Sequence, residues 1–287
     1  MKTLLVNPPY SEFVYESRRK AASLDAPLSI AYIAAVLERE GFEVDILDAN
    51  AFNLTIEKTA ERVADSSADI VGITSTTTVM PVTYRLSREI KKLWRENLQP
   101  SEYRGKKIVV GGPHVTFTDK QTLTECRSID MIARGEGEVT MLELVKNEGD
   151  PKDVNGITYM KGRRIIKNPD RKFIENLDSL PFPARHLLPM NLYRSGSPLS
   201  TGAEGTDYAS MITTRGCPNR CIYCSSSHFW GIKVRFRTAE NVVKEIEHLV
   251  EKYGTREIFF KDDTFTFSPV RTKEICDLII ELSLIHI

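Results

Sequence analysis

Three cysteines stand close together in the second half of the chain, in the stretch Arg-Gly-Cys-Pro-Asn-Arg-Cys-Ile-Tyr-Cys. Cys217, Cys221 and Cys224 form a C-x3-C-x2-C pattern, which a strand-like run at residues 208–214 precedes. The spacing offers three soft thiolate ligands and no fourth, so an iron–sulfur cluster held here would keep one iron open for another ligand. The pattern predicts a cluster with an exchangeable coordination position.

A zinc site is the main alternative, because His228 follows Cys224 by four residues and Cys3His is a known zinc ligand set. Zinc ligands usually come as two separated pairs, whereas these cysteines crowd into eight residues, so the cluster is favoured. A disulfide framework is not expected, since the 287 residues contain only five cysteines and no apolar signal region. Cys126 and Cys276 are expected to be small core residues.

The triplet resembles the signature of the radical S-adenosylmethionine (SAM) superfamily, C-x3-C-Φ-C, with Tyr223 as the aromatic residue before the last cysteine. The resemblance implies that Cys217, Cys221 and Cys224 hold a 4Fe-4S cluster and that SAM chelates the open iron. Electron transfer then cleaves SAM to a 5′-deoxyadenosyl radical, and a reducing partner such as flavodoxin or ferredoxin is implied. Tyr223 would pack near the adenine; an ordinary core tyrosine is the alternative.

Charge and composition narrow the choice of partners. Lys and Arg total 39 against 39 Asp and Glu, so no net field attracts nucleic acid or an anionic membrane. No apolar run is long enough to span a membrane, and a cytoplasmic protein acting on a small-molecule substrate is expected.

The first half of the chain alternates short apolar runs with helical patterns. Strands are expected at residues 3–6, 43–47, 70–73, 107–110 and 131–133, and helices at residues 27–40, 56–66, 82–97 and 140–147. Such βα units with short connections predict an α/β fold with a doubly wound, parallel, flavodoxin-like sheet. Its ligands bind beyond the carboxyl ends of the strands.

Three loops of small residues follow the last three of these strands. They contain Ser75 and Thr76, then Gly111 and Gly112, then Gly135, Glu136 and Gly137. Glycines let a large ligand approach the backbone, and hydroxyl and N–H groups can bind its polar edge. Together, and ahead of the cysteine triplet, the loops resemble the cobalamin-binding domain of B12-dependent radical SAM proteins. The resemblance implies that these residues contact cobalamin.

The D-x-H-x-x-G motif of many cobalamin domains, whose histidine ligates cobalt, is absent from this sequence. The resemblance therefore implies cobalamin bound without a histidine ligand. His114 is the alternative lower ligand, although a loop histidine that hydrogen-bonds the nucleotide tail or the backbone is favoured. A plain nucleotide-binding domain is a further alternative, but the chain has neither a G-x-G-x-x-G nor a G-x-x-x-x-G-K-[ST] loop.

Residues 151–207 are expected to connect a cobalamin-binding domain, residues 1–150, to the start of a radical SAM (β/α) barrel, residues 208–287. A hairpin is expected at residues 156–167, and a proline-containing strap after it resembles the linker of the same family. In the second domain a helix is expected at residues 238–253 and a strand at residues 257–261.

Asp262 and Asp263 follow that last strand in a D-D-x-F segment. The segment resembles the end of the second barrel strand in the radical SAM family, which implies acidic side chains near the amino group of SAM. Capping of the next helix is the alternative. Arg235 and Arg237 are expected to be exposed to solvent, with the substrate channel or the SAM carboxylate as the alternative.

Only two βα units of the barrel, which normally has about six, are expected after residue 208. The last six residues, Leu282 to Ile287, also match one reading frame of a transposase end sequence used in sequencing libraries. We expect a truncated barrel whose native sequence departs after about Glu281; ordinary last helical turns are the alternative.

The resemblance implies an enzyme that uses a 4Fe-4S cluster, SAM and cobalamin to methylate an unactivated carbon or phosphorus centre. Cobalamin-dependent oxidative cyclisation or rearrangement is one alternative, and a non-catalytic metal- or corrin-binding module is another. No catalytic residue is assigned, because the residues that build substrate pockets differ among enzymes of one fold.

Overall fold

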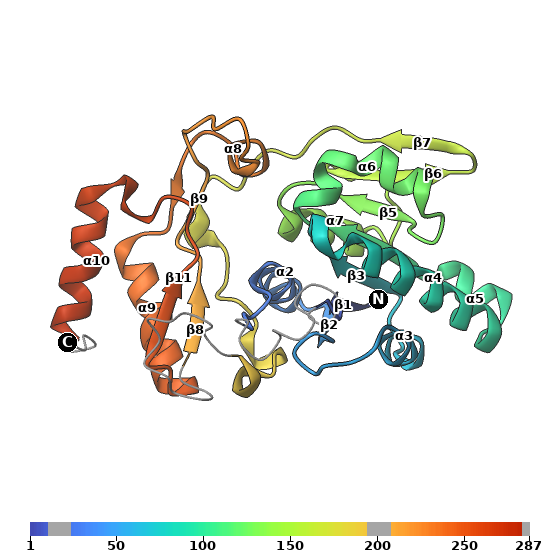
Figure 1. Cartoon of the computed structure of the whole chain (residues 1–287), viewed down its shortest axis with the longest axis horizontal. Coiled ribbons are helices and arrows are strands. Elements are labelled where there is room, and N and C mark those ends of the chain that lie inside the picture. The colour runs from blue at the N-terminus through green and yellow to red at the C-terminus, as the bar shows by residue number, and fades with distance from the viewer. Residues whose placement is uncertain (11–23, 194–207, 283–287) are drawn as a thin grey trace. The chain divides into compact units, whose positions relative to one another are not determined.

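The computed structural model describes residues 1–10, 24–193 and 208–282, and the chain divides into two compact units (Figure 1). Among the described residues, unit 1 comprises residues 1–10, 29–172 and 183–189. Unit 2 comprises residues 24–28, 173–182, 190–193 and 208–282. The expectation for the chain end concerns residues 282–287, of which residues 283–287 lie outside the described residues. No helix within the described ranges is long and apolar enough to cross a membrane.

Unit 1 is built on a sheet whose described strands lie in the order β2-β1-β3-β4-β5-β6-β7. The first five strands run parallel, whereas β6 and β7 are antiparallel to their neighbours. The order 2-1-3-4-5 is that of the flavodoxin-like doubly wound sheet, so the predicted fold class is confirmed. The strands are β1 (Lys2–Asn7), β2 (Glu43–Asp48), β3 (Ile70–Thr74), β4 (Lys107–Gly111), β5 (Met131–Ala133), β6 (Ile157–Lys161) and β7 (Arg164–Lys167).

Helices cover both faces of this sheet. Leu4 and Val6 of β1 pack into one core and Leu5 into the other, because successive side chains of a strand point to opposite faces. The core around Leu4 and Val6 includes side chains of α3, α4 and α6, and the core around Leu5 includes those of α2 and α7. The helices of unit 1 are α2 (Leu28–Arg39), α3 (Ile56–Asp65), α4 (Met80–Asn97), α5 (Pro100–Gly105), α6 (Pro113–Glu125) and α7 (Gly137–Lys146).

The hairpin of β6 and β7 extends the sheet of unit 1. The sequence pattern predicted this hairpin but assigned it to the connector between two domains. In the structure, Ala133 of β5 pairs with Ile157 of β6, so the hairpin covers an edge that β5 would otherwise expose. The compact unit thus continues to Lys172, and a functional boundary at residue 150 stays a prediction.

The described part of unit 2 contains two short sheets. β8 (Tyr208–Met211) pairs in parallel with β11 (Glu257–Phe260), and β9 (Thr214–Arg215) pairs antiparallel with β10 (Arg235–Phe236). The single strand expected at residues 208–214 is therefore divided into β8 and β9.

The helices of unit 2 are α8 (Ser226–Phe229), α9 (Ala239–Tyr253) and α10 (Pro269–Glu281). Ala209 and Met211 of β8 lie in one buried core with apolar side chains of α9 and α10, so these helices cover one face of the β8–β11 sheet. The side chain of Thr238 accepts the N–H of Asn241 and begins α9, and Gly254, with a φ of +64°, ends it.

Candidate cofactor-binding sites

The three small-residue loops of unit 1 meet at the carboxyl edge of the sheet, because β3, β4 and β5 are neighbours. The backbone N–H of Ser75 donates to the carbonyl oxygen of Gly111 at 2.9 Å, which joins the first two loops. The N–H of Gly135 donates to Oγ1 of Thr116 at 3.0 Å, which joins the third loop to α6. The structure therefore brings together the loops that the sequence analysis assigned to cobalamin.

The serine and threonines of the first loop divide into a buried and an exposed group. Ser75 is 1% exposed, and its Oγ lies 3.0 Å from Oγ1 of Thr83 and 2.9 Å from the sulfur of Met80. Thr76 is exposed, and its Oγ1 lies 3.3 Å from that of Thr78. The Ser75 hydroxyl thus stabilises the loop from within, while the Thr76 hydroxyl is accessible to a ligand.

Gly112 is the most constrained position of these loops. Its φ is +112°, and a Cβ placed on it would lie 2.3 Å from the carbonyl oxygen of Ser75. A Cβ on Gly111 would meet nothing closer than the carbonyl oxygen of Ala133 at 3.6 Å. Glycine is therefore required at position 112, where the backbones of two loops approach each other. At position 111 a side chain would find room at the edge of the sheet.

The third loop is held by a buried arginine that the sequence analysis did not identify as a site residue. Arg134 is 5% exposed, and its guanidinium donates to Asp170 at 2.8 Å and to the carbonyl oxygen of Asn168 at 2.7 Å. It also donates to Oγ1 of Thr158, which in turn donates to Asp119 at 2.7 Å. The loop is thereby fixed to α6 and to the β6–β7 hairpin. The signal in the sequence that could have identified Arg134 was its position directly before the Gly-Glu-Gly-Glu run.

Glu136 and the two glycines beside it lie on this fixed loop. Gly135 has a φ of +69°, and a Cβ on it would meet no atom within 4 Å, whereas a Cβ on Gly137 would lie 2.7 Å from Cδ1 of Ile33. Glu136 is 5% exposed, so its carboxylate belongs mainly to the interior of the loop.

His114, the alternative cobalt ligand, stands at the start of α6. Its Nδ1 lies 3.1 Å from Oγ1 of Thr77, a contact between the second loop and the first. The ring of His114 thus contacts a side chain rather than the backbone. Both a bond to the nucleotide tail and ligation of cobalt stay predictions.

The cysteine loop begins at a second constrained glycine. Gly216 has a φ of +107°, and a Cβ on it would lie 2.2 Å from the carbonyl oxygen of Lys233. The N–H of Cys217 donates to the carbonyl oxygen of Gly231 at 3.1 Å, so the start of the loop is held between β9 and β10. Beyond Cys217 the residues are mostly exposed, and Tyr223 is 90% exposed, which excludes the alternative of a core tyrosine.

The three thiols have the donor chemistry of a cluster but do not converge in the structure. Cys217 and Cys224 are half-buried, and Cys221 is exposed. Among the described residues, no three His, Cys, Asp or Glu side chains are close enough together to hold a metal ion. Three thiolates in eight residues fit three irons of a 4Fe-4S cluster by ligand type, so the assignment of Cys217, Cys221 and Cys224 stays a prediction.

The two aspartates after β11 have different environments. The carboxylate of Asp262 accepts the backbone N–H of Thr213 at 2.8 Å and Oγ1 of Thr214 at 2.8 Å, and it also accepts the N–H of Thr214. Asp263 is exposed. The Asp262 carboxylate thus binds the backbone N–H groups between the end of β8 and the start of β9. These groups are not available to a neighbouring strand, which explains why the predicted single strand is interrupted there. Asp263 is the member of the pair that is open to a ligand.

A second buried arginine supports the same turn. Arg271 of α10 is 7% exposed, and it donates to the carbonyl oxygens of Arg237 at 2.7 Å and Thr213 at 3.2 Å. Burial lowers the pKa of its guanidinium, and the nearby Asp262 carboxylate acts in the opposite direction. The sequence analysis missed this residue, because an arginine in the first turn of a helix ordinarily faces solvent.

Three expectations about other side chains can be settled. Cys126 is buried, as expected, but Cys276 is exposed on α10, so its assignment to the core is wrong. Arg235 and Arg237 are 3% and 4% exposed, so their default placement in solvent is wrong as well. Arg237 forms a buried ion pair with Glu245 of α9. The apolar pattern of α9 does not reveal this pair, because Arg237 lies before the helix.

The face of the β8–β11 sheet opposite α9 and α10 carries a polar cluster. The hydroxyl of Tyr208 donates to Oδ1 of Asp25 at 2.5 Å, and Nζ of Lys261 lies 3.1 Å from Oδ2 of the same residue. Burial, assisted by the bond to Asp25, raises the pKa of Tyr208, so its hydroxyl stays protonated and acts as a donor.

Two family descriptions match the chain. Residues 19–145 match the B12 binding domain, and residues 211–287 match the radical SAM superfamily. An uncharacterized methyltransferase, PH0819 of Pyrococcus horikoshii, is 37% identical over 278 residues, which are 96% of this chain and 56% of the relative. The chain belongs to the B12-binding radical SAM protein family.

Other relatives differ in the reaction that their names state. The cytidylyl-2-hydroxyethylphosphonate methyltransferase of Streptomyces wedmorensis is 28% identical, covering 92% of this chain and 55% of the relative. The anaerobic magnesium-protoporphyrin IX monomethyl ester cyclase of Cereibacter sphaeroides is 30% identical, covering 96% and 43%. The chain spans about half the length of the curated relatives it matches.

Solved structures share the fold. The cobalamin-dependent SAM radical enzyme OxsB, with aqua-cobalamin and SAM bound, aligns with a TM-score of 0.75 at 19% identity, covering 98% of this chain and 37% of OxsB. The radical SAM methyltransferase TsrM of Kitasatospora setae, with cobalamin and a [4Fe-4S] cluster bound, aligns with a TM-score of 0.70 at 20% identity, covering 98% and 51%.

Proposed function

We propose that the protein is a cobalamin-dependent radical SAM methyltransferase that acts on an unactivated carbon or phosphorus centre of a small molecule. The observation that carries the proposal is the presence, on one chain, of the B12 binding domain and the Cys217–Cys224 triplet of a radical SAM domain. Relatives named as methyltransferases support the reaction class, and one of them is named for a phosphonate substrate.

The proposed division of labour follows the two units. The edge formed by the exposed Thr76, the half-buried Gly111 and the loop after β5 binds cobalamin, and Cys217, Cys221 and Cys224 hold a 4Fe-4S cluster. When bound, the cluster and SAM supply a 5′-deoxyadenosyl radical, and cobalamin supplies the methyl group. Asp262 fixes the start of the cysteine loop, and Asp263 and Tyr223 are the exposed groups beside it that can orient SAM.

A reducing partner such as flavodoxin or ferredoxin, and a cytoplasmic location in which thiols stay reduced, belong to the same proposal.

Equilibrium dialysis of the full chain against hydroxocobalamin tests the proposed cobalamin site. Gly111→Leu should weaken binding by projecting into the ligand edge. Gly105→Leu is the matched control, because a side chain there meets no atom within 4 Å and lies at the other end of β4. Equal binding by both variants, or none by the parent, would refute the assignment.

A second candidate reaction is cobalamin-dependent oxidative cyclisation or rearrangement, which the relatives named as cyclases favour. Products formed from SAM by anaerobically reconstituted, reduced protein distinguish the candidates. Both S-adenosylhomocysteine and 5′-deoxyadenosine are expected for methylation, and 5′-deoxyadenosine alone for cyclisation or rearrangement. If neither forms although cluster and cobalamin are bound, the chain is a binding module.

A further inference from the structure

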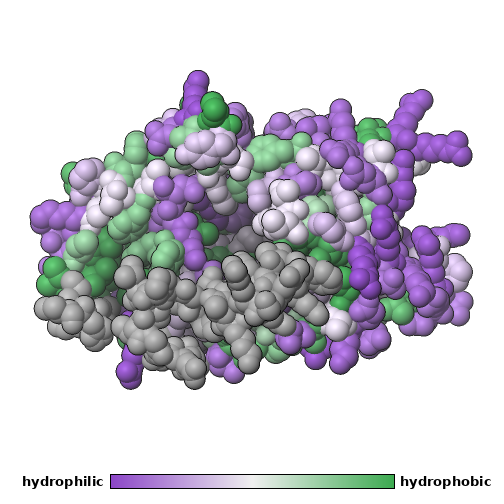
Figure 2. Space-filling view, viewed as in Figure 1, coloured by the Kyte–Doolittle hydropathy of each residue, from purple (hydrophilic) through white to green (hydrophobic). Residues whose placement is uncertain are grey.

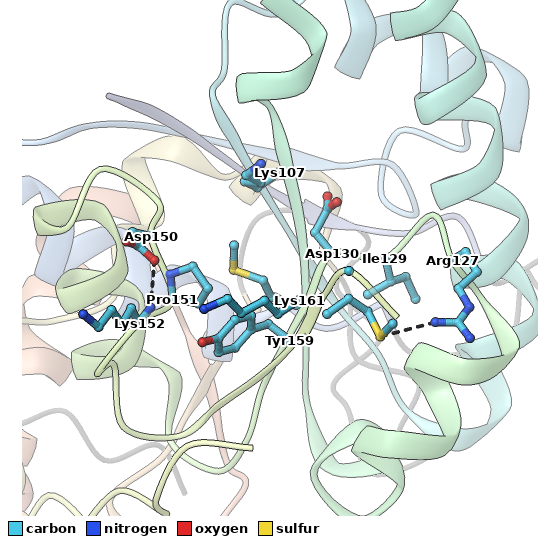
Figure 3. A pocket seen from close by; sticks show the side chains of 12 residues that line it. Lys107, Arg127, Ile129, Asp130, Asp150, Pro151, Lys152, Tyr159 and Lys161 are labelled. Carbon is cyan, nitrogen blue, oxygen red and sulfur yellow. Dashed lines mark hydrogen bonds between the residues drawn. The ribbon is translucent and has the colours of Figure 1, made fainter. Parts of the chain in front are cut away.

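A hollow of about 500 Å³ lies at the edge of the unit 1 sheet opposite the cofactor loops (Figure 3). Lys107 and Met131, which line it, are the first residues of β4 and β5, whereas the loops assigned to cobalamin follow the last residues of these strands. Hydrophilic side chains dominate the visible surface around α5 and the β6–β7 hairpin (Figure 2). The hollow is therefore separate from the proposed B12 site.

Four cationic side chains from four segments border this hollow. They are Lys107, Arg127, Lys152 and Lys161. Within residues 1–10, 24–193 and 208–282, none of them forms an ion pair with a carboxylate. Lys107 donates to the carbonyl oxygen of Arg104 at 3.0 Å, so its charge lies at the end of α5. The other three donate to no helix carbonyl in the described part of the chain.

The two carboxylates of the lining have partners of their own. Asp130 lies 2.7 Å from Nζ of Lys91 and accepts the N–H of Ile108 at 2.7 Å. Asp150 accepts the backbone N–H of Lys152 at 2.9 Å, and no carboxylate of the described residues pairs with the ammonium group of that lysine. The hollow therefore carries an excess of positive charge in a chain whose net charge is zero.

Apolar side chains also line the hollow. They are Ile129, Met131 and Met160, and the ring of Tyr159 lies beside Lys161 (Figure 3). A volume of this size accommodates a small organic molecule, and a lining of cationic and apolar side chains suits an anionic group attached to an apolar or planar body. We propose that the hollow binds a small organic anion bearing a phosphate group.

Calorimetric titration of the full chain with adenosine 5′-monophosphate tests the proposal, at an ionic strength of about 0.05 M where screening is weak. Saturable binding is expected, and adenosine, which lacks the charge, should bind much more weakly. The double variant K152Q/K161Q should lower the affinity about tenfold or more, because two hydrogen bonds to a charged group are lost.

The matched control is K58Q/K120Q, which removes the same charge from exposed positions outside the hollow and should change the affinity less than about twofold. Saturation with hydroxocobalamin should leave the titration unchanged. Absence of saturable binding, equal weakening by both double variants, or displacement by cobalamin would each overturn the proposal, and the first two leave the B12 assignment untouched.

Discussion

The loop after β4 in unit 1 and the cysteine loop in unit 2 begin in the same way and continue differently. Each begins at a glycine with positive φ, Gly112 or Gly216, whose missing Cβ lets two backbones approach. After Gly112 the chain enters α6 at once, and Val115 is fully buried. After Gly216 it passes through exposed residues, and the apolar side chain of Ile222 is fully exposed.

This difference separates two kinds of site. The edge proposed for cobalamin is preformed, because backbone contacts and the buried Arg134 define it without a ligand. The cysteine loop is fixed at its start by Gly216, Asp262 and Arg271, and contacts within the described residues do not bring its thiols together. A cluster bound there would supply the missing cross-links of the loop.

The largest expected effect is that of adding a methyl group at either constrained glycine. Gly112→Ala and Gly216→Ala should each destabilise the fold by about 3 kcal/mol or more, since a strained backbone costs about 1–3 kcal/mol before the clash is relieved. Gly111→Ala is the control and should stay close to the parent, because its Cβ meets only ordinary contacts. Urea unfolding followed by circular dichroism measures the stability of all three variants. A Gly112→Ala variant as stable as the parent would contradict the role assigned to Gly112.

Removal of the arginine that anchors the third loop should come next. Arg134→Met removes the hydrogen bonds of a buried guanidinium and should cost about 2–3 kcal/mol. Asp119 keeps Lys167, 3.2 Å away, so its charge is not left without a partner. Arg164→Met is the control. It changes an exposed arginine of the β6–β7 hairpin, which Arg134 contacts, and should be nearly neutral. Hydrogen exchange should show faster exchange at residues 134–138 in the first variant only; unchanged exchange there would show that the loop is fixed by other contacts.

The two neighbouring aspartates test the start of the cysteine loop. Asp262→Ala removes hydrogen bonds to a charged group and should cost about 2 kcal/mol, with faster exchange at residues 213–217. Asp263→Ala should change stability by less than about 0.5 kcal/mol, as at other exposed positions. Equal effects of the two substitutions would contradict the separate roles assigned to them.

The smallest effect concerns acid stability. Burial alone would raise the pKa of Asp119, but hydrogen bonds from Thr158, the N–H of Lys120 and Lys167 together bring it below the ordinary value of 3.8. The carboxylate therefore contributes stability above that pH, and the contribution is lost as the pH falls through the lower folded-state pKa. Between about pH 6 and pH 3, Asp119→Asn should lose about 1 kcal/mol less stability than the parent, measured by urea unfolding. An equal loss of stability in the variant and the parent would show that the Asp119 carboxylate does not contribute to acid stability.

Local patterns predicted the elements of unit 1 well where apolar periodicity was strong. The helix expected at residues 27–40 is α2, and Gly41, with a φ of +81°, follows its end. The helix α6 was not predicted, because its threonine-rich sequence has little apolar periodicity; Pro113 in its first turn was the available signal. Pairing of the β6–β7 hairpin with β5 was also beyond local patterns, since strand neighbours depend on contacts distant in sequence.

The candidate site shows the same limit. Residue types and spacing singled out the loops and the thiols as candidates, because a bound cofactor would constrain such residues directly. The residues that hold the loops in place, Arg134, Arg271 and Asp262, act through buried partners that the sequence does not reveal. Their roles became visible only from the hydrogen bonds.

Anaerobic reconstitution with iron and sulfide, followed by iron analysis and absorption spectroscopy, tests whether Cys217, Cys221 and Cys224 hold an iron–sulfur cluster. The parent should be brown and bind about four irons, and replacement of Cys217, Cys221 or Cys224 by alanine should abolish this, whereas Cys126→Ala and Cys276→Ala should retain it. Stoichiometric zinc without a chromophore in the parent, or an unchanged iron content in the three loop variants, would contradict the account.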